Sequence, residues 1–158
     1  MKTGIIFFFG AESPFSHWYA SAFKIDGREF CCAGQYIMYQ KAMLFNDNRI
    51  AEKILHSSDP KRHRYLGKQV KHFTKEIWHQ HCMKFSFDAN FARFTQNENL
   101  DSLLLHSNEN SFAEASPYDR IWGIGLSMSN QKIYDPKNWR GRNFAGESLM
   151  QVRAALKK

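Results

Sequence analysis

The chain has 158 residues, enough for one domain that buries a core without disulfide staples. No run approaches the roughly 18 apolar residues of a membrane span, so we expect no contact with a membrane. The three cysteines are an odd number, and Cys31 and Cys32 are adjacent, which does not suit a disulfide framework and fits a reducing cytoplasm. The net charge of +7 is compatible with a phosphate-bearing partner but identifies none.

The first thirty residues predict a strand, a loop and a hairpin. Residues 5–9 are a continuous apolar run that ends at a glycine, which is typical of a buried strand. Residues 11–19 combine a proline with several aromatic side chains and predict a loop. Asp26-Gly27 is typical of a type I′ turn, so residues 22–31 predict a hairpin whose buried faces carry Phe23, Ile25 and Phe30.

Residues 33–45 predict a buried helix, because no breaker follows Gly34 and most of the helix circumference is apolar. At 3.6 residues per turn, positions 34, 38, 41 and 45 form one stripe, so Lys41 points along the same face as Gly34. A lysine on so apolar a helix must reach a carboxylate, water or a ligand.

The other expected helices follow from caps and apolar stripes. One covers residues 47–56, with Ile50, Ile54 and Leu55 inward, and a short helix runs from Asp59-Pro60 to about Gly67. A long helix capped by Thr74 has Trp78, Cys82, Phe85, Ala89 and Ala92 inward. Residues 99–106 predict another helix, and Arg142 or Asn143 opens the last one, with Ala145, Leu149, Val152 and Leu156 inward.

Residues 114–125 concentrate the polar chemistry. Ser116-Pro117-Tyr118-Asp119 predicts a turn, and the flanking residues 111–115 and 121–126 are apolar enough for strands or extended segments. Glu114, Asp119 and Trp122 on such a turn suit a polar, ring-containing ligand. The same pattern also fits a surface turn whose Trp122 fills the core. Residues 127–138 predict a polar loop. Together the elements predict an α+β fold, a mostly helical single domain over residues 1–158 with a short N-terminal strand, a β-hairpin and a few extended segments.

Several familiar sites are not supported by the sequence. His79, His81 and Cys82 look like a metal cluster, but neighbouring positions on a helix diverge. Gly123-Ile124-Gly125 lacks the third glycine of a dinucleotide fingerprint, and no P-loop occurs. Cys31 or Cys32 could be a nucleophile, although buried structural thiols are commoner. We therefore expect no metal and no cofactor.

Taken together, the motifs resemble those of the NADAR family, named for its link to NAD and ADP-ribose. The matching pieces run nearly end to end, and their order and spacing carry the resemblance. They are Pro14-Phe15-Ser16, the hairpin, Gln35-Tyr36-x-x-x-Gln40-Lys41, Leu66-Gly67, Trp78, Lys84-Phe85, Leu103-Leu104, Glu114-Ala-Ser-Pro-x-Asp119-x-x-Trp122-Gly-Ile-Gly125, and Trp139-x-Gly141-x-Asn143-x-x-Gly146-x-x-Leu149-Met150-x-x-Arg153.

The resemblance implies an enzyme that hydrolyses N-glycosidic bonds to ribose. Positive charge builds on the ribose ring as the base leaves, so carboxylates and a positioned water favour the reaction. The candidate catalytic positions are Gly34, Lys41, Glu114 and Asp119. The candidate contacts to ADP-ribose or a ribose phosphate are Tyr36, Trp78, Trp122, Gly123, Arg142, Asn143 and Arg153. We expect the 33–45 helix and the 114–119 turn to share one sugar pocket.

Position 34 departs from the family pattern, which has a glutamate where this chain has Gly34. That glutamate is the family's best candidate for acting on the ribose, so its loss predicts weakened cleavage, by about 100-fold or more for one such group. The chain is then either an N-glycosidase of reduced activity or a module that holds ADP-ribose without turnover.

The substrate that the resemblance implies is ADP-ribosylated guanine in DNA, in a repair or antitoxin-like role. The alternative substrate is a ribosylamine phosphate of riboflavin biosynthesis, which needs no nucleic acid surface. A basic cluster suits the DNA, although it could equally be a solvated helix face. We define the basic cluster as Lys61, Arg62, Arg64, Lys68 and Lys71.

Overall fold

The computed structural model describes residues 4–158, so the first three residues of the predicted 1–158 domain lie outside the described residues. The chain divides into two compact units. Unit 1 holds the described residues up to Tyr19 together with Glu98–Lys158, and unit 2 is Ala20–Asn97. The expectation of one domain stays a prediction.

A tight hairpin opens unit 2. Strands β2 (Phe23–Ile25) and β3 (Arg28–Phe30) pair antiparallel. Asp26 and Gly27 adopt positive φ values of 52° and 79°, as the type I′ turn requires, so the predicted hairpin is confirmed. Phe23 and Phe30 face each other across the strands with ring centroids 5.7 Å apart, and both are buried, whereas Ile25 is only partly buried.

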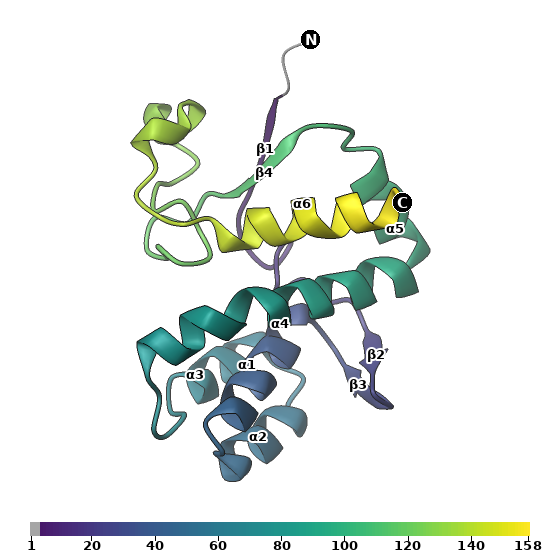
Figure 1. Cartoon of the computed structure of the whole chain (residues 1–158), viewed down its shortest axis with the longest axis vertical. Helices are drawn as coiled ribbons and strands as arrows, with labels where there is room; N and C mark the ends of the chain where they lie inside the picture. The colour runs from purple at the N-terminus through teal and green to yellow at the C-terminus, as the bar shows by residue number, and fades with distance from the viewer. Residues whose placement is uncertain (1–3) are drawn as a thin grey trace. The chain divides into compact units, whose positions relative to one another are not determined.

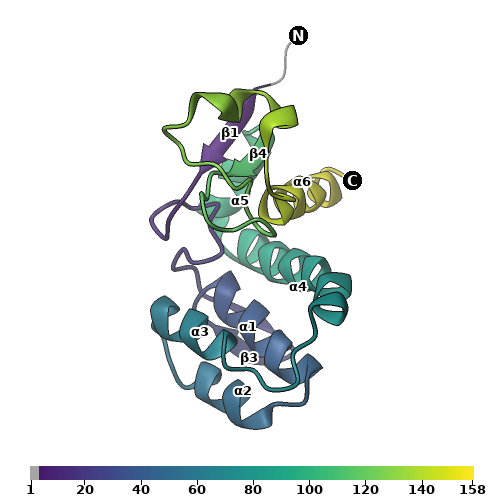
Figure 2. The ribbon, with the colours of Figure 1, turned by 90° about the vertical axis from the view of Figure 1, so that its left-hand side faces the viewer.

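Four helices complete unit 2: α1 (Ala33–Leu44), α2 (Asn48–Leu55), α3 (Pro60–Gly67) and α4 (Lys75–Gln96). Helix α1 is central, because it packs against the other three (Figures 1 and 2). Asp47 and Asp59 accept the N–H groups of Ile50 and Lys61 and so begin α2 and α3. Thr74 precedes α4 as predicted, but its side chain makes no capping hydrogen bond.

Unit 1 is built on two parallel strands (Figure 1). Strand β1 (Ile5–Phe8) pairs with β4 (Ser111–Glu114), with Phe8 opposite Glu114. Helix α5 (Glu98–Leu105) leads towards β4, and helix α6 (Phe144–Leu156) packs against both α5 and β4. A buried cluster under β4 closes the core of the unit; it consists of Ala113, Ala115, Ile124, Leu126 and Ile133.

Two local predictions in unit 1 are wrong. Residues 121–126 form bends rather than the predicted strand or extended segment; they are held by single backbone bonds, such as that from the Ile124 N–H to the Glu114 carbonyl at 2.9 Å. Residues 127–138 are not only loop, because they contain two 3₁₀ helices, Gln131–Tyr134 and Pro136–Asn138. Asn130 and Asp135 accept backbone N–H groups and so begin these two turns.

The predicted α+β class is confirmed, since helices dominate and each sheet has two strands. Among the described residues, every helix is too short or too polar to cross a membrane.

Candidate functional site

Lys41 lies on α1 among aromatic rings. Its ammonium nitrogen is 4.5 Å from the centre of the Phe73 ring and 5.7 Å from that of Trp78. Within residues 4–158 the ammonium makes no hydrogen bond or ion pair, and burial lowers the pKa of Lys41 below its ordinary value of 10.5. A partly desolvated cation stabilised only by ring faces is well suited to receive an anionic group.

The first turn of α1 carries Gly34 and Tyr36. Gly34 is buried, and the turn contains no acidic residue. A glutamate at position 34 would therefore stand at the positive end of the α1 dipole. Tyr36 is 5% exposed, packs edge-on against Phe30 at 5.1 Å, and has a pKa raised first of all by burial.

A groove of about 490 Å³ lies on unit 2 and is lined by residues of the hairpin turn, α1 and α4. Tyr36 and Gln40 line it, whereas neither Lys41 nor Trp78 does. Its charged lining residues, Asp26, Lys84 and Asp88, are not among the candidate site residues predicted from the sequence. Lys84 and Asp88 form an exposed ion pair at 3.2 Å, which largely neutralises this part of the groove.

Asp119 shapes its own turn, as predicted. One carboxylate oxygen, Oδ1, accepts the N–H groups of Ile121 at 2.9 Å and Trp122 at 2.8 Å. The other, Oδ2, has no hydrogen-bond partner among residues 4–158, and the side chain is partly exposed. The turn therefore fixes the carboxylate while leaving one oxygen for a ligand.

Glu114 ends β4 and is held from behind by Asn143. The Asn143 side chain accepts the Glu114 N–H at 3.0 Å and donates to the Phe112 carbonyl at 2.8 Å. Asn143 itself has a left-handed φ of 54° and makes no capping hydrogen bond to α6. The Glu114 side chain is only 8% exposed, so β4 carries a largely buried carboxylate.

Trp122 and Gly123 follow the turn directly. Trp122 packs edge-on against His17, with ring centroids 5.0 Å apart, and contacts Phe144 at 6.3 Å. A Cβ on Gly123 would meet the Ser116 Cβ at 2.8 Å, so only glycine fits beside the turn. His17 is 4% exposed and was missed in the sequence, where it is one of several aromatic side chains in a loop.

The two candidate arginines differ in exposure. Arg142 is exposed, and its guanidinium lies 6.0 Å from the Phe144 ring. Arg153 is 7% exposed, lies over the Phe112 ring at 5.3 Å, and donates to the Ser107 hydroxyl at 2.7 Å. These contacts give Arg153 a structural role in unit 1, and its assignment as a ligand contact stays a prediction.

The candidate residues thus form one set in each unit. In unit 2, Lys41 and Trp78 lie together; in unit 1, Glu114, Asp119 and Trp122 lie along one short stretch beside Asn143. The sugar pocket expected from the 33–45 helix and the 114–119 turn draws on both units and stays a prediction. All five residues of the basic cluster are exposed, and they belong to α3 and the residues that follow it.

Known proteins resemble the chain over nearly its whole length. It is 38% identical over 160 residues to N-glycosidase R617 of Acanthamoeba polyphaga mimivirus, covering 94% of this chain and 94% of that protein. It is 37% identical over 168 residues to Protein irg-1 of Caenorhabditis elegans, covering 96% of this chain and 79% of that protein. The NMR structure of the Escherichia coli protein YbiA, which is named an N-glycosidase, matches with a TM-score of 0.81 and 26% identity over 99% of this chain and 87% of that one.

The resemblance noted in the sequence is confirmed by these matches and by the NADAR domain model, which matches residues 7–157. The chain belongs to the NADAR domain family.

Proposed function

We propose that this chain is an N-glycosidase that hydrolyses the bond between a ribose and a base, and that its substrate is ADP-ribosylated guanine in DNA. The observation that carries the proposal is membership in a family in which R617 and YbiA, similar over nearly all of this chain, are named N-glycosidases. ADP-ribosylated guanine is the substrate that the family resemblance implies, and the described residues support a charged, phosphate-bearing substrate.

The carboxylates of unit 1 suit the charge that develops on the sugar. As the base departs, the ribose ring becomes positively charged, and a fixed carboxylate lowers the energy of that state without reorganising. Asp119 is fixed by two backbone N–H groups and keeps one oxygen unbonded. In the proposed reaction Asp119 stabilises the positively charged ribose ring or orients the attacking water. Glu114 accepts a hydrogen bond from a hydroxyl of the ribose.

Lys41 suits the phosphate portion of the substrate. Its ammonium has no anionic partner among residues 4–158 and is already partly removed from water. A phosphate would supply the missing counter-charge, and the buried Trp78 beside Lys41 would form a wall of that site. A role for Lys41 as the amine that traps the opened sugar as an imine is the less favoured chemistry, since hydrolysis needs no covalent intermediate.

The basic cluster supports DNA over a small metabolite. Its five side chains are exposed within a short stretch, and Lys and Arg at such a density attract a phosphate backbone. The competing substrate, a ribosylamine phosphate, has no phosphate backbone that could contact the basic cluster.

A direct assay separates the possibilities. The protein is incubated with guanine-ADP-ribosylated DNA and, separately, with the ribosylamine phosphate, and the released sugar is measured alongside ADP-ribose affinity. We expect ADP-ribose release from the modified DNA, slowed by Gly34. Release from the ribosylamine phosphate alone would assign the metabolic substrate, and ADP-ribose binding with no release from either would assign a binding module.

A further inference from the structure

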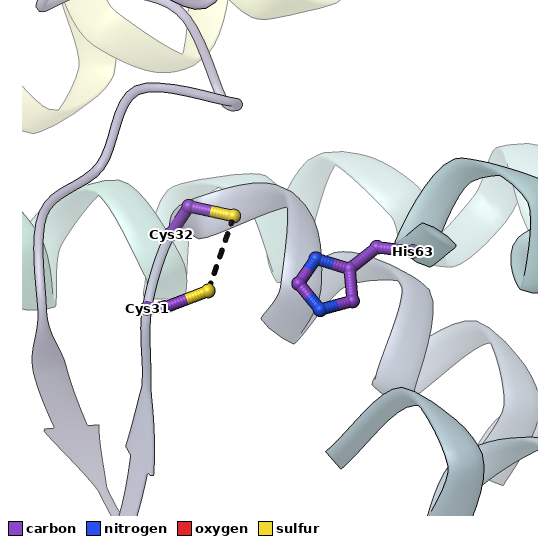
Figure 3. A group of neighbouring side chains, drawn as sticks. All are labelled: Cys31, Cys32 and His63. Carbon is purple, nitrogen blue, oxygen red and sulfur yellow. Dashed lines mark hydrogen bonds between the residues drawn. The ribbon is translucent and has the colours of Figure 1, made fainter. Parts of the chain in front are cut away.

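Three metal-ligating side chains meet in unit 2, beside the first turn of α1. Cys31 and Cys32 lie between the hairpin and α1, and His63 lies on α3. One ligand atom from each comes within 4.8 Å of the other two (Figure 3). Cys32 and His63 are 1% and 0% exposed, whereas Cys31 is partly exposed and offers a route in from solvent.

One ring nitrogen of His63 is free to act as a ligand. Its Nε2 lies 2.6 Å from the carbonyl oxygen of Ser57, and because a carbonyl can only accept, Nε2 carries the ring proton. Nδ1 therefore keeps a free lone pair. It is buried and has no hydrogen-bond partner among residues 4–158, an arrangement that ordinarily costs free energy. An ion bound at Nδ1 would use this lone pair and remove that cost in free energy.

The spacing of the two thiols also fits one ion. Their sulfur atoms lie 3.9 Å apart, where the Cys31 thiol donates a hydrogen bond to Cys32, and this is far beyond a disulfide bond of about 2.05 Å. Two thiolates on a tetrahedral ion, each at about 2.3 Å, stand roughly 3.8 Å apart. The pair is thus already at the separation that a shared ion requires, and closing the remaining gap to His63 needs a shift of about 1 Å.

A buried amide braces the ligands. Gln35 accepts the Cys31 N–H at 2.8 Å and donates to the carbonyls of Ile54 and Ser57, each at 3.0 Å. The same Ser57 carbonyl orients His63. Metal sites commonly hold a histidine through its second ring nitrogen and a backbone carbonyl in this way.

We propose that Cys31, Cys32 and His63 bind one thiophilic transition-metal ion, Zn²⁺, as a Cys₂His site whose fourth position is filled by water. Two thiolates and an imidazole are the donors that Zn²⁺ prefers, and each thiol loses its proton on binding. The ion would tie the end of β3 to α3 and fix the start of α1, the helix that carries Gly34 and Lys41. The adjacent cysteines were expected to be structural thiols, and no sequence pattern pointed to His63 as their partner.

Cobalt substitution tests the site. The reduced, metal-free protein is titrated with Co²⁺, whose thiolate charge-transfer and d–d absorption report sulfur ligands and tetrahedral geometry, and Zn²⁺ is then added to displace it. We expect one equivalent to bind. Cys31→Ser, Cys32→Ser and His63→Gln should each weaken binding by at least about 100-fold, more than the loss of an outer-shell partner. Cys82→Ser and His56→Gln are matched controls outside the cluster and should leave binding unchanged.

A second readout covers variants that fold poorly. Zn²⁺ should raise the Tm of the wild-type protein and of Cys82→Ser but not that of Cys31→Ser, a partly exposed position where serine is tolerated. Absence of a thiolate band, or an equal Zn²⁺-induced rise in Tm in Cys31→Ser and the wild type, would overturn the proposal.

Discussion

At the scale of single residues, the informative side chains are those whose polar groups lack an ordinary partner. Among residues 4–158, Lys41 has ring faces in place of a counter-ion, Asp119 keeps one carboxylate oxygen unbonded, and His63 keeps a buried lone pair. His63 is buried and departs from the rule that buried polar groups are satisfied within the fold, whereas Lys41 and Asp119 are partly exposed. In each case the proposed ligand would supply what the protein does not, namely an anion, a polar group of the sugar, or a metal ion.

Lys41 gives a pH-dependent prediction. Because burial lowers its pKa, the folded protein holds this proton less tightly than the unfolded chain does. Burying the charged ammonium lowers the free energy of unfolding, and this loss is fully present below the pKa that Lys41 has in the folded protein. The loss is relieved as pH rises from that pKa towards 10.5. Lys41→Met should therefore be more stable than the wild type at neutral pH, with the advantage shrinking at alkaline pH.

Urea unfolding across that pH range measures the effect, with Lys53→Met as the control, since Lys53 is exposed. A stability difference for Lys41→Met that stays constant with pH would contradict the assignment of the burial cost to this ammonium.

At the scale of elements, short-range signals predict structure well and long-range pairing does not follow from them. Asp26-Gly27 and Asp59-Pro60 act through their own turn and cap chemistry, and both elements form where predicted. The parallel pairing of β1 with β4 joins strands at distant places in the chain, so no local pattern reveals it. Residues 121–126 have the composition of a strand, yet backbone bonds to Glu114 and Arg140 hold them in bends.

Asn143 joins α6 to β4, and its removal should be costly. Asn143→Ala leaves the buried Glu114 N–H and Phe112 carbonyl unpaired and places an alanine at a left-handed φ. We expect a loss of about 2–4 kcal/mol in the free energy of unfolding, measured by denaturant titration. Asn130→Ala removes an exposed cap and should cost about 1 kcal/mol; equal losses in the two variants would refute the bridging role.

Helix α3 and the residues after it carry the basic cluster, and a charge-matched pair of variants tests its role. Replacing Lys61, Arg62 and Arg64 by glutamine should weaken binding to guanine-ADP-ribosylated DNA. It should also make the slope of log affinity against log salt concentration shallower, by about 0.9 for each phosphate that the protein no longer neutralises. The control changes Lys132, Lys137 and Arg140, which are basic residues of unit 1. Equal effects from both sets would indicate a general charge effect rather than a binding surface.

At the scale of the whole molecule, the sequence predicted the α+β class and the family but not how its sites are assembled. The family motifs are separated along the chain, and the NADAR domain model matches residues 7–157, which confirms the family. The Cys31, Cys32 and His63 cluster escaped notice, because only the packing of α3 against α1 brings the histidine to the thiols. The role of Asn143 was also hidden, because an asparagine at a helix start is ordinarily a cap.

The central claim is that the chain cleaves a ribose–base bond and that position 34 limits its rate. The direct measurement is the rate of ADP-ribose release from guanine-ADP-ribosylated DNA by the wild type, Gly34→Glu and Gly34→Ala. We predict slow release by the wild type and about 100-fold or greater acceleration by the glutamate alone, because only it adds a carboxylate. No release by any of the three proteins, or equal acceleration by glutamate and alanine, would contradict the claim.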